Sequence, residues 1–158
     1  MPFALPLAAF KTPLYDANIG ANSFGDLPEW DLTDLYESPD CPALSRDLAE
    51  VETQVQGFAA AYQGKLAGLS AAELLDCVTT YEAIDITAGR IMSFAGLRYY
   101  QNTLDSDRAK FMADMQDKIT TFTTPLVFFA LEFNRLDEGH LATLLTENAA
   151  LARYKPVF

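Results

Sequence analysis

The sequence contains one histidine, His140, and this scarcity limits the chemistry available to the chain. The zinc-binding motif H-E-x-x-H needs two histidines on one helix face, so it is absent. A di-iron bundle needs a Glu-x-x-His pair from each of two helices, whereas Asp137-x-x-His140 is one imperfect pair. We therefore expect His140 to be a surface residue in the first turn of a helix, and we assign no metal ligand to this chain.

The few cysteines and the composition of the N-terminus bear on the compartment of the protein. Cys41 and Cys77 are the only two cysteines, too few for a disulfide framework and not spaced as a zinc knuckle. We expect buried or unreactive thiols in a reducing compartment. Pro2 and Pro6 interrupt the apolar N-terminus and Lys11 follows it, so no signal peptide is expected. No apolar run approaches the roughly 18 residues of a membrane span, and we predict a cytoplasmic location.

Basic residues are few, since 11 Lys and Arg stand against 22 Asp and Glu, for a formal net charge of −11. Nucleic acids and anionic membranes bind basic surfaces, so neither is expected as a partner. Residues 1–40 hold five of the eight prolines and seven acidic side chains against one basic. Because proline disfavours helix, we expect an extended acidic lead-in over 1–40 and a helical domain over 41–158. The side chains expected to anchor the lead-in are Trp30, Leu32, Leu35 and Tyr36.

Apolar residues recur at spacings of three and four along most of the chain, which predicts an all-α fold. The expected architecture is an antiparallel bundle of three long amphipathic helices plus a short fourth helix. The predicted helices are 42–63, 70–102, 105–136 and a short one capped by Asp137. The segment PLVFFALEF alone resembles a buried strand, but the helical spacing continues through it without a break, which favours helix.

Local signals place the ends of the first two helices. Pro42 suits a first turn, where backbone N–H groups have no helical partner. Gly64 and Gly68 are expected to end the first helix as C-cap glycines. Ser70 and Glu73 form a capping box at the start of the second helix.

Glycine and proline inside the predicted helices carry further expectations. Gly89 and Gly96, seven residues apart, predict a small-residue face where another helix approaches closely. Pro125 removes one backbone hydrogen bond and should kink the third helix near Thr121. The threonines expected to bond freed carbonyls there are Thr120, Thr121, Thr123 and Thr124.

Candidate catalytic groups are isolated from one another in the sequence. Ser23 lies in a glycine-flanked string, 20–25, whose spacing differs from the nucleophile motif G-x-S-x-G. A Ser–His or Cys–His pair would have to use the one histidine, and no motif supports it. The residues of two carboxylate pairs lie three apart on helix faces, and we expect solvated surfaces there rather than acid–base sites. These pairs are Glu82 with Asp85, and Asp114 with Asp117.

An aromatic pair, Tyr99–Tyr100, lies beside Arg98. Tyrosine suits sites with one dry and one wet end, so these residues are expected at a helix interface, with ligand binding as the alternative. No catalytic, cofactor-binding or metal residue is assigned to the chain from these candidates.

Three strings in order carry a family resemblance. They are W-D-L-x-D-L-Y at 30–36, Y-x-G-K-L at 62–66 and T-P-L-x-F-F-x-L-E-x-N-R-L at 124–136. We call them the Trp30, Gly64 and Pro125 strings. Over about residues 26–158 the chain resembles the N-terminal region of the oligoendopeptidase F family, relatives of thimet oligopeptidase. The matched residues look structural, with Trp30 as an anchor, Pro125 as a kink, and Asn134 and Arg135 near a helix end.

The resemblance implies a cytoplasmic zinc metallopeptidase that hydrolyses short peptides, of which this chain is the N-terminal helical segment. In that family zinc is held by H-E-x-x-H and a later Glu in a C-terminal catalytic part, where a metal-activated water attacks the peptide carbonyl. The N-terminal helices form part of the wall that limits access to the substrate channel. The chain lacks that catalytic part, so we expect it to be inactive alone, with the missing catalytic domain as its partner.

A second hypothesis is an autonomous helical module for protein interaction, without catalysis. Either way, helical faces that would rest on a missing part are expected to expose apolar patches. We expect self-association through these patches, as a homodimer.

Overall fold

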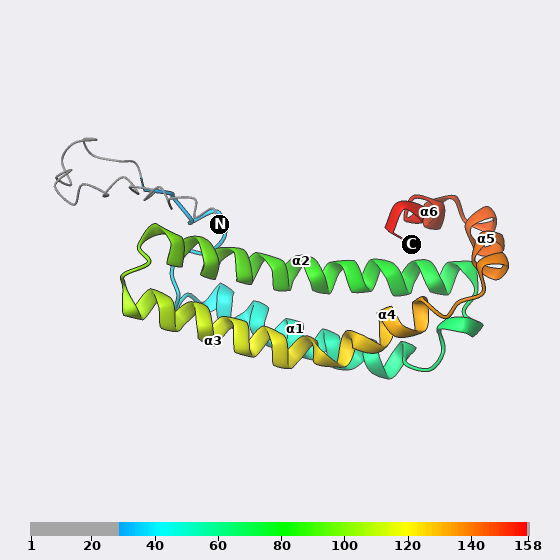
Figure 1. Ribbon diagram of the computed structural model, residues 1–158, viewed down its shortest axis with the longest axis horizontal. Helices are drawn as coiled ribbons and strands as arrows, with labels where there is room; N and C mark the ends of the chain where they lie inside the picture. The colour runs from blue at the N-terminus through cyan, green and yellow to red at the C-terminus, as the bar shows by residue number, and fades with distance from the viewer. Residues whose placement is uncertain (1–28, 158) are drawn as a thin grey trace, which may run out of the picture. The chain divides into compact units, whose positions relative to one another are not determined.

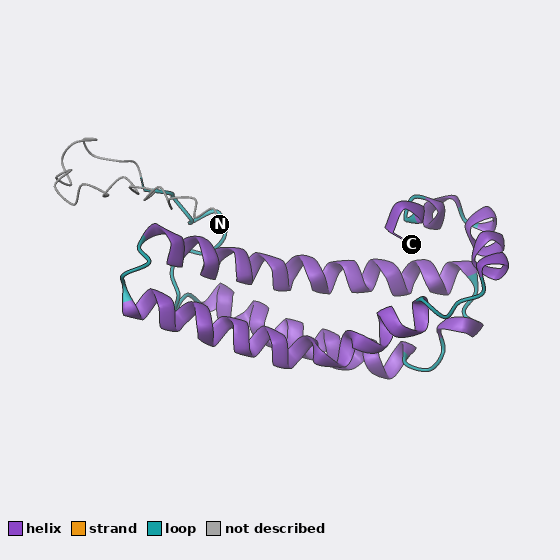
Figure 2. Cartoon of the chain, viewed as in Figure 1, coloured by secondary structure: helices purple, strands orange, loops and turns teal. Residues whose placement is uncertain are grey.

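The computed structural model describes residues 29–157, and in this range the secondary structure is helical with no strand (Figures 1 and 2). The all-α prediction is confirmed for this range. The chain divides into two units, residues 1–30 and 31–158, and the helices belong to the second. No helix of the described range is long and apolar enough to cross a membrane. The expectations for Pro2, Pro6, Lys11 and Ser23 lie outside the described residues.

Long helices α1, α2 and α3 lie alongside one another and contact each other pairwise, and two short helices contact α2 (Figure 1). The helices are α1 (Pro42–Tyr62), α2 (Ala71–Gln101), α3 (Ser106–Thr123), α4 (Val127–Phe133), α5 (Glu138–Glu147) and α6 (Ala149–Ala152). The 3-10 turns of this range are η1 (Leu66–Gly68), η2 (Thr124–Leu126) and η3 (Lys155–Val157). Helices α5 and α6 contact each other and α2.

The ends of α1 and α2 follow the sequence signals closely. Pro42 is the first residue of α1, and Gly64 adopts a positive φ of 78° just after the helix ends. The Ser70–Glu73 capping box is present, with the Ser70 N–H donating to the Glu73 carboxylate at 2.8 Å. The prediction for Gly68 is wrong, because this residue closes η1 instead of capping a helix. The intervening η1 turn was not predicted, since three residues are too short to show a period.

The third predicted helix is two helices, α3 and α4, separated by the 3-10 turn η2 around Pro125. The predicted kink exists but follows Thr121, because the chain tightens at the proline itself rather than at the carbonyl that loses its donor. Thr123 Oγ1 donates to the Ile119 carbonyl at 2.8 Å and Thr124 Oγ1 to that of Thr120 at 2.7 Å, but neither bond reaches the Thr121 carbonyl, which is the one that loses its donor at Pro125. The Thr120 carbonyl also accepts the Thr124 backbone N–H, so the predicted role of these threonines is not borne out.

Three further expectations about helices need correction. Helix α4 ends at Phe133, not Leu136, because Asn134 caps it and the chain then turns. Asp137 caps α5 as predicted, but a further helix, α6, follows with Asn148 as its cap. The prediction that another helix approaches closely at Gly89 and Gly96 is also wrong.

The two glycines fail as a packing face for a simple geometric reason. A Cβ added at Gly89 would meet nothing within 4 Å, and one at Gly96 would meet only the Tyr100 ring of the same helix, at 3.8 Å. Ala88, Ala95 and Gly96 are buried, whereas Gly89 is exposed. The glycine spacing therefore does not mark a single face where another helix approaches.

Apolar side chains form two clusters. The first core joins α1, α2, α3 and α4 and comprises Tyr36, Cys41, Leu44, Val51, Val55, Phe58, Leu66, Cys77, Ile84, Ala88, Ile91, Phe94, Ala95, Met115, Leu126 and Phe128. The second core joins the start of α2 to α5 and α6 and comprises Ala71, Leu74, Val78, Leu144 and Leu151. Helix α2 therefore contributes to both clusters, which overlap along its length because Cys77 belongs to the first core and Val78 to the second.

Residues 31–36 pack on the first core through the buried Tyr36, with Leu32 and Leu35 partly buried against it, as predicted for these three residues. The Trp30 side chain is 56% exposed, whereas Tyr36 is 2% exposed and packs edge-on against Phe94, with ring centroids 5.3 Å apart. The expectation that Trp30 is an anchor stays a prediction.

Candidate functional site

A buried carboxylate, Asp47, lies where the lead-in meets the helices. Its Oδ2 accepts a hydrogen bond from the Tyr36 hydroxyl at 2.8 Å, and Arg46 and Arg90 pair with the same carboxylate at 3.0 and 3.5 Å. The Arg90 guanidinium lies 4.5 Å from the Tyr36 ring centroid and donates to the Leu35 carbonyl. Burial and the bond to Asp47 raise the pKa of Tyr36 well above its usual value. Every group here has a partner inside the chain, so the cluster is a structural junction rather than a reactive site.

Sequence reasoning missed Asp47, although a signal was present. Asp47 lies three residues after Leu44 and four before Val51, so it falls on the apolar stripe of α1. A charged residue on a buried stripe needs a partner, and that requirement points to a buried pair.

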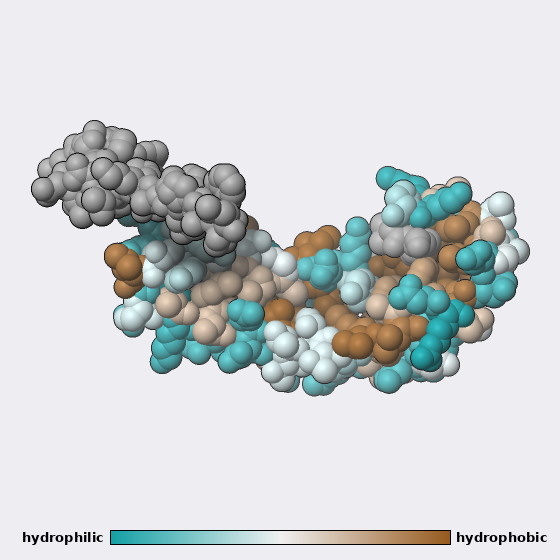
Figure 3. Space-filling model, viewed as in Figure 1, coloured by the Kyte–Doolittle hydropathy of each residue, from teal (hydrophilic) through white to brown (hydrophobic). Residues whose placement is uncertain are grey.

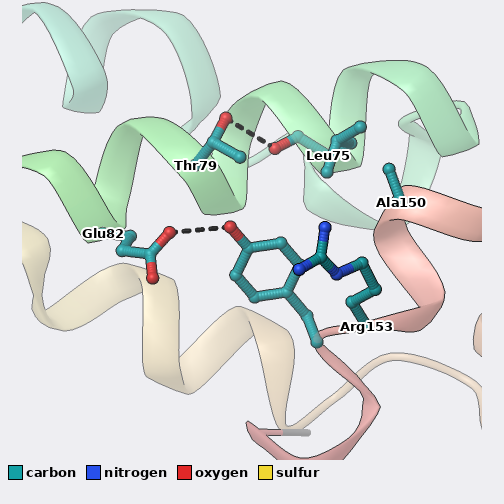
Figure 4. Close-up of a pocket in the computed structure, with 6 residues that line it drawn as sticks. Leu75, Thr79, Glu82, Ala150 and Arg153 are labelled. Carbon is teal, nitrogen blue, oxygen red and sulfur yellow. Dashed lines mark hydrogen bonds between the residues drawn. The ribbon is translucent and has the colours of Figure 1, made fainter.

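A hollow of about 470 Å³ lies between α2 and the chain segment that follows α5 (Figure 4). Thr79 and Glu82 come from α2, and Ala150 and Arg153 face them from α6 and its end. We call this hollow the Arg153 cleft. The Tyr154 hydroxyl donates to Glu82 Oε2 at 2.7 Å, which ties the end of the chain to α2. This hydrogen bond, together with burial, raises the pKa of Tyr154.

A second hollow, of about 380 Å³, lies between α2 and α4 and shares Glu82 and Tyr154 with the first. We call it the aromatic cleft, because four of its lining residues are aromatic: Tyr81, Phe129, Phe133 and Tyr154. Hydrophobic surface gathers over α4 and in the recess between α4 and α2 (Figure 3). Volumes of this size are typical of small-molecule sites.

The rings of the aromatic cleft are held in place by their own packing. Tyr81 and Phe129 stack with centroids 4.4 Å apart, and Phe129 contacts Phe133 at 5.8 Å. Phe129 also meets Phe58 of the first core edge-on at 5.8 Å. The cleft wall is therefore continuous with the buried core, which gives it a preformed shape. Of the described part of the chain, we take the aromatic cleft as the candidate functional site.

The carboxylate pairs from the sequence have different surroundings. Glu82 and Asp85 are exposed and line the aromatic cleft, so this pair lies at the candidate site. Asp114 and Asp117 are exposed on α3, as the sequence analysis expected for both pairs. The expectation for Glu82 needs refinement, since it accepts the Tyr154 hydroxyl as well as facing solvent. Sequence reasoning missed Tyr154 because it lies beyond the last periodic segment.

The histidine and the cysteines form no shared site. His140 is exposed in the first turn of α5, and its backbone N–H donates to Asp137 at 2.8 Å, as predicted. Cys41 and Cys77 are both free and buried, also as predicted. Among the described residues, no group of three or more His, Cys, Asp or Glu side chains is gathered to hold a metal ion.

The two thiols differ in their acidity. Burial raises the pKa of Cys77 to about 12. Burial acts in the same direction on Cys41, but backbone hydrogen bonds at Leu44 and Ser38 outweigh it, so the pKa of Cys41 is lowered.

Tyr99 and Tyr100 differ in exposure. Tyr99 is partly buried, whereas Tyr100 is 62% exposed, and their ring centroids lie 5.5 Å apart. The exposure of Tyr100 argues against the predicted interface role for that residue, and for Tyr99 the role stays a prediction. Arg98 beside them is partly buried.

No family model, curated protein or solved structure matches this chain. The family resemblance therefore rests on the Trp30, Gly64 and Pro125 strings and on what their residues do in the fold.

Proposed function

We propose that this chain is the N-terminal helical segment of a zinc-dependent oligoendopeptidase that hydrolyses short peptides. In this role the helices form part of the wall that limits access to the substrate channel. The zinc and the groups that activate water belong to a catalytic domain that this chain does not contain, and no step of hydrolysis is assigned to the residues described above. The chain alone is inactive.

One observation carries the proposal: residues of the Gly64 string and the Pro125 string form hydrogen bonds with each other. Glu132 of the Pro125 string accepts hydrogen bonds from the backbone N–H groups of Gly64, at 2.7 Å, and Leu66, at 3.4 Å. Those two residues belong to the Gly64 string, more than 60 positions earlier. A carboxylate that holds a distant turn gives the two strings a joint structural task, which supports their reading as parts of one wall segment.

The other string residues also have defined structural tasks. Lys65 donates to the Ala60 and Ala61 carbonyls at 3.2 and 2.7 Å, which satisfies the open end of α1. Asn134 caps α4, near a helix end as expected. Strings whose residues set turns and helix ends support a wall segment rather than a catalytic one.

We also infer that α1, α2 and the α3–α4 run form an antiparallel bundle. The connection between α1 and α2 and the one between α2 and α3 are short, which favours antiparallel neighbours. The pairwise contacts among the three helices support the same arrangement.

The native gene product provides the test of the peptidase proposal. Its mass, measured in lysate of its own cell, is expected to be several times 17.4 kDa. The purified product should cleave a fluorogenic short peptide, lose activity with a zinc chelator and regain it with zinc. The 158-residue chain, assayed in parallel with added zinc, should show no cleavage. A native product of 17.4 kDa, or zinc-dependent cleavage by this chain alone, would refute the proposal.

A second candidate is an autonomous helical interaction module, which exposed apolar residues favour. Val127 and Leu131 lie one turn apart on α4 and are 59% and 54% exposed. Such a surface suits a second copy of the chain or the missing domain. Sedimentation of the 158-residue chain should show a dimer that Leu131→Asp weakens, whereas a strict monomer at high concentration argues against self-association.

A further inference from the structure

The aromatic cleft combines ring faces with negative charge. Tyr81 and Phe129 form one wall, and Glu82 and Asp85 lie on the α2 side of the opening, three residues apart. The described residues that line the cleft include these two carboxylates and no lysine or arginine. Asp85 is exposed and forms no ion pair with any residue in the described range.

Arg153 lines the Arg153 cleft but not the aromatic cleft, and the hydrogen-bonded pair Tyr154 and Glu82 lines both hollows. The formal net charge of −11 adds a negative field around the whole chain. A cation entering the aromatic cleft therefore meets attraction from the rim and from the chain as a whole.

Aromatic faces attract cations through the negative charge above the ring, and apolar walls bind the hydrocarbon part of the same molecule. We propose that the aromatic cleft binds a primary ammonium ion carried on an apolar body, with the ammonium group against Asp85 and the apolar body among the rings. A free amine and the side chain of lysine share this chemistry. The proposal does not depend on the peptidase assignment, because all of its groups lie in this chain.

Phenethylammonium chloride, titrated into the uniformly ¹⁵N-labelled 158-residue chain, is the probe. Amide resonances of residues 78–85 in α2 and 129–134 in α4 are expected to shift together along one saturable curve. The neutral isostere 2-phenylethanol has the same ring and length without the charge. Its dissociation constant should be roughly three- to thirty-fold larger, since it loses the ion pair and the cation–ring attraction.

Two matched variants separate the cleft from the overall negative charge. Asp85→Asn removes the exposed rim carboxylate and should raise the dissociation constant for phenethylammonium by roughly three- to ten-fold. Asp114→Asn removes one exposed carboxylate from α3, outside the cleft lining, and should leave the constant unchanged. Circular dichroism of both variants confirms that the fold is retained, since neither side chain is buried.

The source of the ammonium group is tested by competition. Displacement of phenethylammonium by N-acetyl-lysine methylamide supports a peptide side chain as the ligand, and no displacement supports a free amine. The proposal is overturned if 2-phenylethanol binds as tightly as the cation, if no cleft resonance shifts at millimolar probe, or if Asp114→Asn weakens binding as much as Asp85→Asn. None of these outcomes involves zinc or peptide cleavage, so failure here is distinct from failure of the peptidase proposal.

Discussion

The first and second cores share helix α2 but are closed in different ways. The first core collects side chains from four helices and the lead-in, and polar contacts lock its margins: Tyr36 with Asp47 on one side, Glu132 with Gly64 on the other. The second core packs two short helices against α2, and the Tyr154 hydroxyl bonds Glu82 of α2. Both clefts lie around that hydroxyl bond, beside the second core. The clefts therefore lie where two short helices close the fold against α2, and the first core is closed by longer helices and by polar contacts on two sides.

Helix length explains why the second core depends on its neighbour. Helix α5 has 10 residues and α6 has four, below the roughly 12–15 at which an isolated helix becomes stable in water. Leu144 and Leu151, at 4% and 0% exposure, must pack on α2 for these helices to persist. We expect this end to open locally at a lower free energy than the first core.

Phe58→Ala should have the largest effect, because Phe58 is 2% exposed at the centre of the first core. Its ring contacts Tyr62, Phe128 and Phe129 with centroids 5.0 to 5.8 Å apart. Loss of this ring should lower the free energy of unfolding by about 3–5 kcal/mol, measured by urea denaturation. Tyr100→Ala, an exposed aromatic on α2, is the control and should change it by less than about 0.5 kcal/mol. Equal losses in the two variants would mean that the first core does not carry the stability.

Leu151→Ala should cost less and act locally. The free energy of unfolding should fall by about 2–3 kcal/mol, the lower end of the range for a buried leucine. The loss is small because a four-residue helix can relax around the missing methyl groups. Hydrogen exchange should accelerate at residues 138–157 and stay unchanged in α1. If amide hydrogen exchange in α1 accelerates as much as in α5, the two cores do not open independently.

Asp47→Ala tests the junction that holds the lead-in. Removal of this buried carboxylate leaves the Tyr36 hydroxyl without its acceptor, and a loss of about 1.5–3 kcal/mol is expected in urea denaturation. The arginines add little, since the Arg46 and Arg90 side chains are 69% and 43% exposed. Asp40→Ala, an exposed acid beside the same segment, is the matched control. A loss equal to that of the control would show that Tyr36 finds another partner.

The same comparison shows which parts of the fold were predictable. Helices α1 and α2 were placed within about two residues, because long amphipathic periods and explicit caps such as Ser70 and Glu73 act locally. Helix α6 was missed, since four residues show no period, and its cap Asn148 is a common loop residue. A kink was predicted near the η2 turn because the position of Pro125 is known from the sequence. That the chain forms a 3-10 turn there depends on packing, which the sequence pattern does not show.

The candidate site was less predictable than the fold. Glu82 and Asp85 were recognised as a pair, and Phe129 and Phe133 as members of an apolar stripe. What the sequence does not state is that α4 lies beside that part of α2 and that Tyr154 returns to Glu82, 72 residues earlier. Contacts at such separations follow from the packing of whole helices, not from local pattern.

Tyr62→Phe should have the smallest effect, visible only at alkaline pH. Burial and the hydrogen bond that the Tyr62 hydroxyl donates to Asp76 raise the pKa of Tyr62 from 10.0 to about 12. A pKa that is higher in the folded state stabilises the fold fully below pH 10, and this contribution is lost as pH rises towards 12. The free energy of unfolding of the unmodified chain should therefore fall more steeply between pH 10 and 12 than that of Tyr62→Phe. Cys77 and Tyr36 are present in both proteins, so the difference between the curves isolates Tyr62. Parallel curves across this range would show that the Tyr62 hydroxyl titrates alike in the folded and unfolded states, and that the Tyr62–Asp76 contact does not join α1 to α2.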